Sequence, residues 1–263
     1  MIDLHCHILP GLDDGPPAME MALEMCRIAV DDGIRTIVAT PHMLNGVYAI
    51  PPALVHKSIE EISRILEKES IPLRVLPGAD IHVDNSLIEC LDNGELLTVA
   101  DRGRHLLLEF PQDTVPREVK DLLFQLQLKG LTPIITHPER NVEIQQNVDL
   151  LKEFIQMGNL TQITAGSLVG TFGSRIKEFT QKLLEYRMVH LVATDAHNAD
   201  RRPPLLSEAR KIVEDCLGPE EADLIFLKRP AMIIQGTHVE PPEPLIEQYE
   251  SPKKKKFWNR FFS

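Results

Sequence analysis

Short apolar runs that end in a potential metal ligand recur along the whole chain. They are Ile2 to His7, which contains His5 and His7, Leu73 to Ala79 before Asp80, Leu106 to Leu108 before Glu109, Pro133 to Thr136 before His137, and Val189 to Thr194 before Asp195 and His197. Alternate side chains of a strand share a face, so His5 and His7 point the same way. Parallel strands of a barrel bring their carboxyl ends to one rim. The pattern therefore predicts a metal site at such a rim.

Helical spacing of apolar residues fills the stretches between these runs. We predict strands over 2–7, 34–40, 73–79, 105–110, 132–137, 160–164 and 189–195, and helices over 19–30, 52–69, 85–91, 116–129, 148–157, 176–186, 205–216 and 220–227. Seven strands alternating with helices favour an α/β fold of the (β/α)7 barrel type. An open doubly wound sheet is the alternative, but no glycine-rich phosphate loop follows an early strand.

The length and composition fit one barrel-sized domain with a separate end. The chain has 263 residues, 43% of them hydrophobic, and we expect a domain over 1–239. Residues 240–252 are proline-rich and acidic, which is typical of an extended linker. No uninterrupted apolar run is long enough to cross a bilayer. The four cysteines are isolated in the sequence, which favours reduced thiols over a disulfide framework. We expect a cytoplasmic protein.

The charge is divided between an acidic body and a basic end. The net charge of the whole chain is −11. Residues 253–263 contain five of the 28 basic residues and no acidic residue, so the rest of the chain has 39 acidic and 23 basic residues. An acidic body argues against broad nucleic-acid binding. The end combines four lysines and Arg260 with four aromatic residues, which favours peripheral contact with an anionic membrane surface. A solubilising end or a contact with an acidic neighbour are the alternatives.

The candidate ligands combine imidazole and carboxylate without cysteine. With two loop residues added, they are His5, His7, Asp14, His42, Asp80, Glu109, His137, Asp195 and His197. Such donors suit Mn, Fe or Zn, and nine of them suggest two or three ions. Clusters of this kind lower the pKa of a bridging water and hold the oxygens of an in-line displacement, as in metallo-phosphoesterases. Each residue taken alone has another explanation: His42 could lie in a turn, Asp14 could cap the following segment, and Glu109 could form a buried ion pair. The occurrence of such residues at five strand ends nevertheless favours a metal site.

Two arginines are candidate phosphate ligands. Arg140 follows His137 by three positions and Arg202 lies in Arg201-Arg202-Pro203-Pro204. A guanidinium holds a phosphate through two parallel hydrogen bonds, although Arg140 could instead pair with Glu139. A thiol-dependent tyrosine phosphatase needs an arginine six positions after its cysteine. None of the four cysteines has one, so a cysteinyl-phosphate route is not expected.

Together these motifs resemble a known family. His5-Cys6-His7, Asp13-Asp14-Gly15-Pro16, Thr40-Pro41-His42, Gly78-Ala79-Asp80-Ile81, Leu108-Glu109-Phe110, His137-Pro138-Glu139-Arg140 and Asp195-Ala196-His197-Asn198 occur in the order of the polymerase and histidinol phosphatase (PHP) superfamily. The chain is most similar to the manganese-dependent bacterial protein-tyrosine phosphatases of capsule and exopolysaccharide synthesis. The resemblance covers Met1 to about Pro230.

The resemblance implies a distorted seven-stranded barrel with three Mn²⁺ ions at the carboxyl ends of its strands. The implied ligands are His5, His7, Asp80 and Asp195 for the first ion, Asp80, Glu109 and His137 for the second, and Asp14, His42 and His197 for the third. Arg140 would bind the phosphate, and Arg202 is a weaker candidate. Asp80 departs from the family, which usually has glutamate there, so the bridge between two ions is one methylene shorter.

The implied substrate is a phosphotyrosine protein, and the implied partner is a membrane-associated bacterial tyrosine kinase that controls polysaccharide export. His42 or a bound water would serve as the general acid. Two alternatives remain at this point. One is a PHP phosphatase for a small ester such as histidinol phosphate, and the other is a weakly active metal-binding scaffold that regulates a kinase.

Overall fold

The computed structural model describes residues 1–245, whose nine strands pair in parallel in two sheets. The smaller sheet contains β1 (Ile2–Cys6), β2 (Thr36–Ala39) and β4 (Arg74–Pro77), in the order β1-β2-β4. The larger sheet follows the order β3 (His42–Met43), β5 (Asp80–His82), β6 (His105–Glu109), β7 (Thr132–Thr136), β8 (Leu160–Thr164) and β9 (Leu191–Ala193). The predicted α/β class and the parallel pairing are confirmed.

Two neighbouring strands pass from one sheet into the other without changing register. Thr36 pairs with Arg74 in the smaller sheet and His42 pairs with Asp80 in the larger, an offset of 38 residues in both. The break falls at Pro41, which lacks an amide donor, and at Gly78, where a Cβ would lie 2.6 Å from Cγ1 of Val38. The strand predicted over 73–79 is present but shorter, as β4, whereas the bend at Gly78 and the second strand, β5, which begins at Asp80, were not predicted.

The segment after β9 runs beside β1, although these strands belong to different sheets. The Asp195 amide donates to the carbonyl of His5 at 2.8 Å, and the His7 amide donates to the carbonyl of Ala196 at 2.9 Å. The buried carboxylate of Asp3 accepts from the amide of Thr194 at 3.0 Å and from its hydroxyl at 2.5 Å. These bonds bring the carboxyl ends of the first and last strands together.

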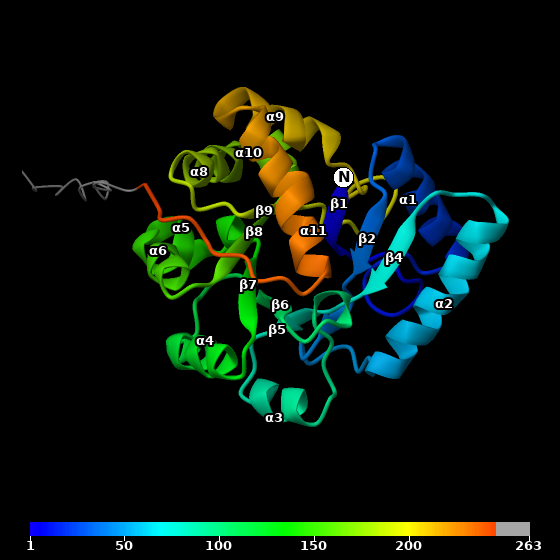
Figure 1. The fold of residues 1–263 in the computed structure, drawn as a ribbon, viewed down its shortest axis with the longest axis horizontal. Helices are drawn as coiled ribbons and strands as arrows, with labels where there is room; N and C mark the ends of the chain where they lie inside the picture. The colour runs from blue at the N-terminus through cyan, green and yellow to red at the C-terminus, as the bar shows by residue number, and fades with distance from the viewer. Residues whose placement is uncertain (246–263) are drawn as a thin grey trace, which may run out of the picture.

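In the part of the chain that the structure describes, eleven α-helices surround the strands, as Figure 1 shows. They are α1 (Met19–Asp31), α2 (Pro52–Lys68), α3 (Leu87–Asp92), α4 (Val119–Leu128), α5 (Val142–Gln146), α6 (Asp149–Gln156), α7 (Ala165–Val169), α8 (Ser174–Glu185), α9 (Ser207–Leu217), α10 (Pro219–Asp223) and α11 (Arg229–Ile234). The 3₁₀ turns are η1 (Val99–Asp101) and η2 (Pro138–Arg140). Among residues 1–245, no helix has the length and hydropathy needed to span a bilayer.

The predicted helix over 220–227 is too short. The chain stays helical through α10, a π-helical turn η3 (Leu224–Lys228) and α11. A proline inside a helix removes an amide donor and clashes with the preceding turn, yet Pro230 lies within this helical stretch, near the start of α11. The wider π turn directly before it accommodates the ring, as π-bulges do. Helices α5 and α7 were also not predicted, because five residues give too short a pattern to recognise.

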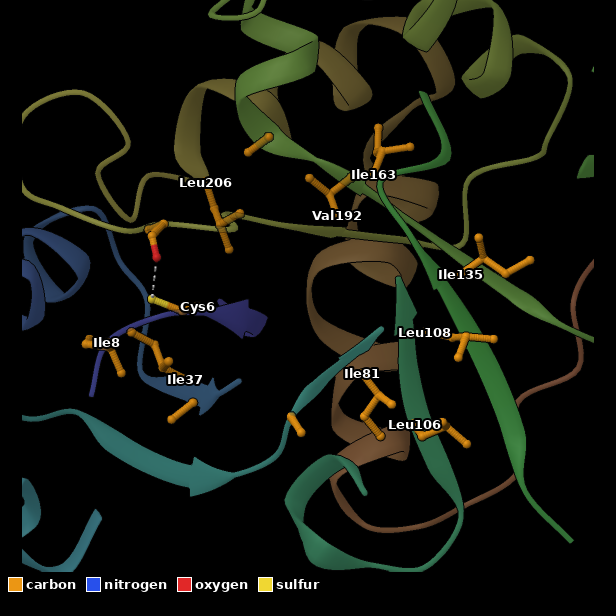
Figure 2. Close-up of a cluster of buried hydrophobic side chains, with 14 of the residues drawn as sticks. Cys6, Ile8, Ile37, Ile81, Leu106, Leu108, Ile135, Ile163, Val192 and Leu206 are labelled. Atoms are coloured by element: carbon orange, nitrogen blue, oxygen red, sulfur yellow. Dashed lines mark hydrogen bonds between the residues drawn. The ribbon is translucent and has the colours of Figure 1, made fainter. Parts of the chain in front are cut away.

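Apolar side chains occupy both faces of the strands. Figure 2 shows the face towards the helices, with Ile37, Ile81, Leu108, Ile135, Ile163 and Val192 each coming from a different strand. The opposite face carries a smaller cluster with Leu4, Val38, Leu107, Ile134, Leu160 and Leu191. Ile233 of α11 packs onto this second cluster, and α11 lies across the middle of the strands (Figure 1).

Strand periodicity then places the candidate ligands. Residues two positions apart share a face, so Glu109 follows Leu107 and Thr136 follows Ile134 on the side of the smaller cluster. Apolar residues therefore occupy this side at the beginning of the strands, and polar residues occupy it at their ends.

Candidate metal centre

His5 and His7 face each other at the end of β1. Their Nε2 atoms lie 3.2 Å apart. Nδ1 of His5 lies 2.8 Å from the side-chain oxygen of Gln162, and Nδ1 of His7 lies 2.6 Å from the carboxylate of Asp13. Because these oxygens accept hydrogen bonds from Nδ1, Nε2 is the nitrogen of each ring that is directed towards the other histidine. A metal ion between the rings would be bound through the two Nε2 atoms.

A second group of donors surrounds Asp80 at the start of β5. Its Oδ2 atom lies 3.6 Å from Nε2 of His5 and 3.4 Å from Nδ1 of His42. Glu109, at the end of β6, places Oε2 3.6 Å from the same His42 nitrogen and Oε1 3.5 Å from Nε2 of His137. Within residues 1–245, Oδ2 of Asp80 and Nδ1 of His42 are buried without a hydrogen-bond partner. Buried polar atoms are normally satisfied, so both need another partner.

A third group lies at the mouth of the cluster. One donor atom from each of His7, Asp14, His42 and His197 falls within 4.8 Å of the others. Oδ1 of Asp14 lies 3.3 Å from Nε2 of His197 and 3.6 Å from Nε2 of His42. The Asp14 side chain is 50% exposed, whereas that of His197 is 6% exposed. The cluster is thus open to solvent at Asp14.

Asp195 connects the histidines to two arginines. Its Oδ1 atom lies 3.5 Å from Nε2 of both His5 and His7. Its Oδ2 atom lies 2.7 Å from Nη2 of Arg140 and 2.5 Å from Nη2 of Arg202. Both guanidinium groups are therefore held beside the candidate ligands by a single carboxylate.

Glu139 is not the partner of Arg140. Its buried Oε1 atom accepts from the amide of Thr164 at 2.9 Å and from the hydroxyl of Ser167 at 2.6 Å. These bonds attach the turn η2, which contains Arg140, to the end of β8 and the start of α7. The carboxylate positions the turn and leaves the guanidinium directed at Asp195.

Phe172, between α7 and α8, packs against both arginines. The centre of its ring lies 5.2 Å from Cζ of Arg140 and 6.0 Å from Cζ of Arg202. A cation near an aromatic face at these distances is attracted to the π-electrons. The ring therefore holds the two guanidinium groups on one side of the site.

A pocket of about 430 Å³ opens over this arrangement. Its polar lining residues include Asp14, His42, Glu109, His137, Asp195, His197, Arg140 and Arg202. Its apolar lining residues are Phe110, Pro138, Phe172 and Ile176. The pocket thus combines anion-binding groups, potential metal ligands and aromatic side chains.

Opposing charges stabilise ionised groups in the site. Burial alone would lower the pKa of His7, but the carboxylates of Asp13 and Asp195 outweigh it and raise this pKa to about 10. Burial would likewise raise the pKa of Asp195, yet Arg140 and His5 hold it well below its usual range. A site that keeps carboxylates ionised and attracts positive charge is suited to cations.

Two of the candidate ligands have unusual backbone angles. His137 has φ 35° and Asp195 has φ 50°. Side chains with a Cβ rarely adopt this left-handed region, and residues that do so cluster at functional sites. In both cases the conformation occurs where a strand ends and turns its side chain into the pocket.

The residues present fit a metal ion. Every donor is nitrogen or oxygen, and the facing Nε2 atoms and the unpaired atoms of Asp80 and His42 are directed at the same space. Cys6, between His5 and His7, is directed away, with Sγ 3.9 Å from the carbonyl of Ala196. A thiolate-free set of this kind suits Mn, Fe or Zn.

The structure brings all nine candidate ligands into one contact network, and both arginines border it. Four contributing residues were not identified from the sequence. They are Asp13, Gln162, Phe172 and His82, whose Nδ1 lies 3.4 Å from Oε2 of Glu109. A polar Gln162 within a buried strand was the one available signal.

Comparison with known proteins gives one family. The family model for capsular polysaccharide synthesis, CpsB/CapC, matches residues 1–235. The tyrosine-protein phosphatase YwqE of Bacillus subtilis is 42% identical over 247 residues, which cover 93% of this chain and 96% of YwqE. The tyrosine-protein phosphatase CpsB of Streptococcus pneumoniae is 32% identical over 239 residues, covering 89% of this chain and 98% of CpsB.

Solved structures agree with these matches. A structure from the study of YwqE from Bacillus subtilis and CpsB from Streptococcus pneumoniae, described as unique metal-dependent tyrosine phosphatases, superposes with a TM-score of 0.89. It is 42% identical, and the match covers 93% of this chain and 99% of that one. The lactonase Lmo2620 of Listeria monocytogenes, 12% identical with a TM-score of 0.58 over 91% of this chain and 95% of its own, is similar in fold alone.

Proposed function

The chain belongs to the CpsB/CapC family of capsular polysaccharide synthesis, and we propose that it is a metal-dependent protein-tyrosine phosphatase, the activity by which its relatives are named. The observation that carries the proposal is the composition of the pocket. Arg140 and Arg202 lie beside clustered metal-type donors, and Phe110 and Phe172 line the same pocket. These are the groups that an aryl phosphate requires.

Arg140 and Arg202 would bind the phosphate oxygens. Both guanidinium groups already converge on one oxygen of Asp195, and charge-assisted bonds from a guanidinium to phosphate are short and directional. The tyrosine ring would lie against Phe110, Phe172 and Ile176, which are apolar lining residues of the pocket. The phosphorus atom would then lie over the donor cluster.

We assign the nine donors to three ions, as the family resemblance implies, with Mn²⁺ as the proposed metal and Fe or Zn as alternatives. The first set is His5, His7, Asp80 and Asp195, the second is Asp80, Glu109 and His137, and the third is Asp14, His42 and His197. The proximity of the first and third sets supports the assignment. In the second set Glu109 contacts His137, and His42 also lies close to Asp80 and Glu109. When bound, the metal would supply Lewis-acid stabilisation of the phosphoryl oxygens and lower the pKa of the attacking water.

His42 is the proposed general acid. Its ring lines the pocket and is 15% exposed, with Nε2 directed to Asp14 and Nδ1 to Asp80. The leaving phenolate has a pKa of about 10, so a proton from a neighbouring group gives modest help. Glu139 would keep Arg140 in place through its bonds to Thr164 and Ser167.

Further properties belong to the same proposal. The two sheets, joined by the bent strands and by the bonds between β1 and the end of β9, would form the distorted (β/α)7 barrel of a domain over 1–239. The substrate would be a tyrosine kinase of capsule or exopolysaccharide synthesis, dephosphorylated in the cytoplasm. The predicted linker and membrane contact, over 240–263, lie for their larger part outside the described residues.

The test is phosphate release from a phosphotyrosine peptide and from histidinol phosphate, with protein stripped of metal and reloaded with Mn, Fe or Zn. We expect turnover of the peptide that requires metal and is highest with Mn, and little turnover of the small ester. Preference for histidinol phosphate would refute the tyrosine phosphatase assignment. If neither substrate is hydrolysed at full metal loading, the alternative of a weakly active metal-binding scaffold that regulates a kinase would be favoured.

A further inference from the structure

A second hollow lies next to the pocket. It measures about 620 Å³ and is formed by residues 43–52 together with Asp84, Glu95 and Leu96. We call it the 43–52 groove. Its lining is mainly apolar, with Met43, Val47 and Ile50 contributing, and its two charged lining residues are both acidic.

The groove adjoins the pocket at Tyr48. His42 of β3 lines the pocket, whereas the next residue, Met43, lines the groove from the opposite face of the strand. Tyr48, on the groove side, stacks on the His42 ring with centroids 6.3 Å apart and an interplanar angle of 8°. A molecule that leaves the pocket past His42 therefore meets Tyr48 and then the groove.

The segment that forms the groove has a defined shape. The side-chain oxygen of Asn45 accepts from the amides of Val47 and Tyr48, both at 3.0 Å, which is the pattern of an Asx turn. This turn presents Val47 to solvent with 75% of its surface exposed, the largest exposure among the large hydrophobic residues described. Val47 continues the mainly apolar lining of the groove to its rim, and contiguous apolar surface of this kind is typical of a binding surface.

We propose that the 43–52 groove binds the residues next to phosphotyrosine in the substrate protein and selects a stretch with apolar and basic side chains. This inference rests on the proposed phosphatase function. Arg140 and Arg202 favour a negative group in the pocket, whereas Asp84 and Glu95 favour positive groups in the groove. The preferred substrate is therefore dipolar, and acidic flanking residues are repelled.

The test compares kcat/KM for two phosphotyrosine peptides, one flanked by lysine and one by glutamate, with that for p-nitrophenyl phosphate, which is too small to reach the groove. The full-length, metal-loaded protein should prefer the lysine peptide. Glu95→Lys should lower the preference for lysine over glutamate about three- to tenfold, since exposed charge pairs are weak. Val47→Ser should lower the ratio of either peptide to p-nitrophenyl phosphate about threefold, because apolar contact is lost.

Glu214→Lys is the matched control, since it makes the same charge reversal at an exposed position of α9. An unchanged peptide preference in Glu95→Lys, or an equal change in Glu214→Lys, overturns the inference. A rise in turnover of all three substrates with Glu95→Lys also overturns it, because the groove would then hold the basic end of the chain itself. Failure of the unaltered protein to hydrolyse either peptide instead refutes the phosphatase function.

Discussion

Nε2 of His5 lies 3.2 Å from Nε2 of His7, while the second nitrogen of each ring is bonded to an oxygen acceptor. Gln162 and Asp13, which supply these oxygens, therefore determine which nitrogen is free to bind metal. Residues that hydrogen-bond to a metal ligand without contacting the metal orient that ligand and raise its basicity. The two rings are directed at a cation site by residues that do not themselves reach it.

Asp13→Asn should weaken metal binding. Oδ2 of Asp13 accepts from Nδ1 of His7 at 2.6 Å and from the amide of His42 at 3.1 Å, while Oδ1 accepts from the amide of Gly15 at 3.0 Å. Asparagine has a single oxygen and no charge, so it cannot accept on both sides. We expect the affinity for the most weakly held ion to fall about 10- to 100-fold. Calorimetric titration of stripped protein with Mn²⁺ measures this. Asp215→Asn, at an exposed position of α9, is the control, and equal affinities would exclude a role for Asp13.

Arg140→Lys should reduce catalysis although it keeps the charge. A lysine offers a point charge in place of two parallel donors, and loss of a positioned donor in a phosphate site reduces kcat/KM about 100-fold. The inhibition constant of inorganic phosphate should rise in parallel. Arg175→Lys, at an exposed position of α8, should leave both values unchanged. Retention of full activity in Arg140→Lys would contradict the phosphate-binding assignment.

Phe172→Leu should weaken phosphate binding without removing any charge. The ring contacts both guanidinium groups, and each such contact at a partly exposed site is worth about 0.5–1 kcal/mol. We expect a loss of about three- to tenfold in kcat/KM, and Phe172→Tyr should retain most of the activity because it keeps the aromatic face. Phe124→Leu, with a 56% exposed ring on α4, controls for loss of an aromatic residue. Equal activity of Phe172→Leu and the unaltered protein would rule out this role.

His190 should make the fold sensitive to acid. Burial, and then the charge of Arg229, lowers the pKa of His190 to about 3, and its Nδ1 atom accepts from the amide of Thr161 at 2.9 Å. At pH values between this pKa and the ordinary pKa of about 6.5, the imidazole of His190 binds a proton in the unfolded chain but not in the folded chain. Stability due to this group is therefore complete above about pH 6.5 and falls by about 1 kcal/mol per pH unit as the pH drops towards 3.

Urea unfolding of metal-free protein at several pH values between 4.5 and 6.5 measures the effect. His190→Asn, which keeps an acceptor for the Thr161 amide, should be less stable at pH 6.5 but show a shallower dependence on pH. His56→Asn, whose imidazole side chain is 43% exposed, should keep the slope of the unaltered protein. Identical slopes in His190→Asn and the unaltered protein would contradict the prediction.

Gly78→Ala should destabilise the fold at the bend. The added Cβ would lie 2.6 Å from Cγ1 of Val38, and overpacking of a filled core costs about 1–3 kcal/mol. Val38→Ala removes the atom that clashes, so the double variant should be more stable than the sum of the two single changes predicts. A double-mutant cycle of urea unfolding tests this, and additive effects would locate the strain elsewhere.

Much of the candidate site could be predicted because strand periodicity is local. Glu109 follows Leu107 by two positions in β6, so once the strand is recognised both side chains must share a face. Burial of the apolar partner directs the polar residue to the common space. Asp195 is different, because it lies beyond β9 and its φ of 50° departs from the strand conformation.

The remaining contacts depend on distances that the sequence does not encode locally. Asp13 and Asp14 are adjacent carboxylates in one loop, and only the path of the loop decides that Asp13 orients His7 while Asp14 faces His197. Phe172 is a single aromatic residue in a turn, with no periodic partner. Its contacts with Arg140 and Arg202 join segments whose relation is set by packing.

The bent strand pair restricts which length changes the gene can tolerate. His42 and Asp80 are neighbours because the two segments, β2 to β3 and β4 to β5, use the same number of residues to pass from one sheet to the other. Deleting one residue at Pro41 or Gly78 would turn the following side chains to the opposite face of the strand. Insertions and deletions should therefore accumulate between Leu44 and Leu73, and in the two bends they should survive only when both change together.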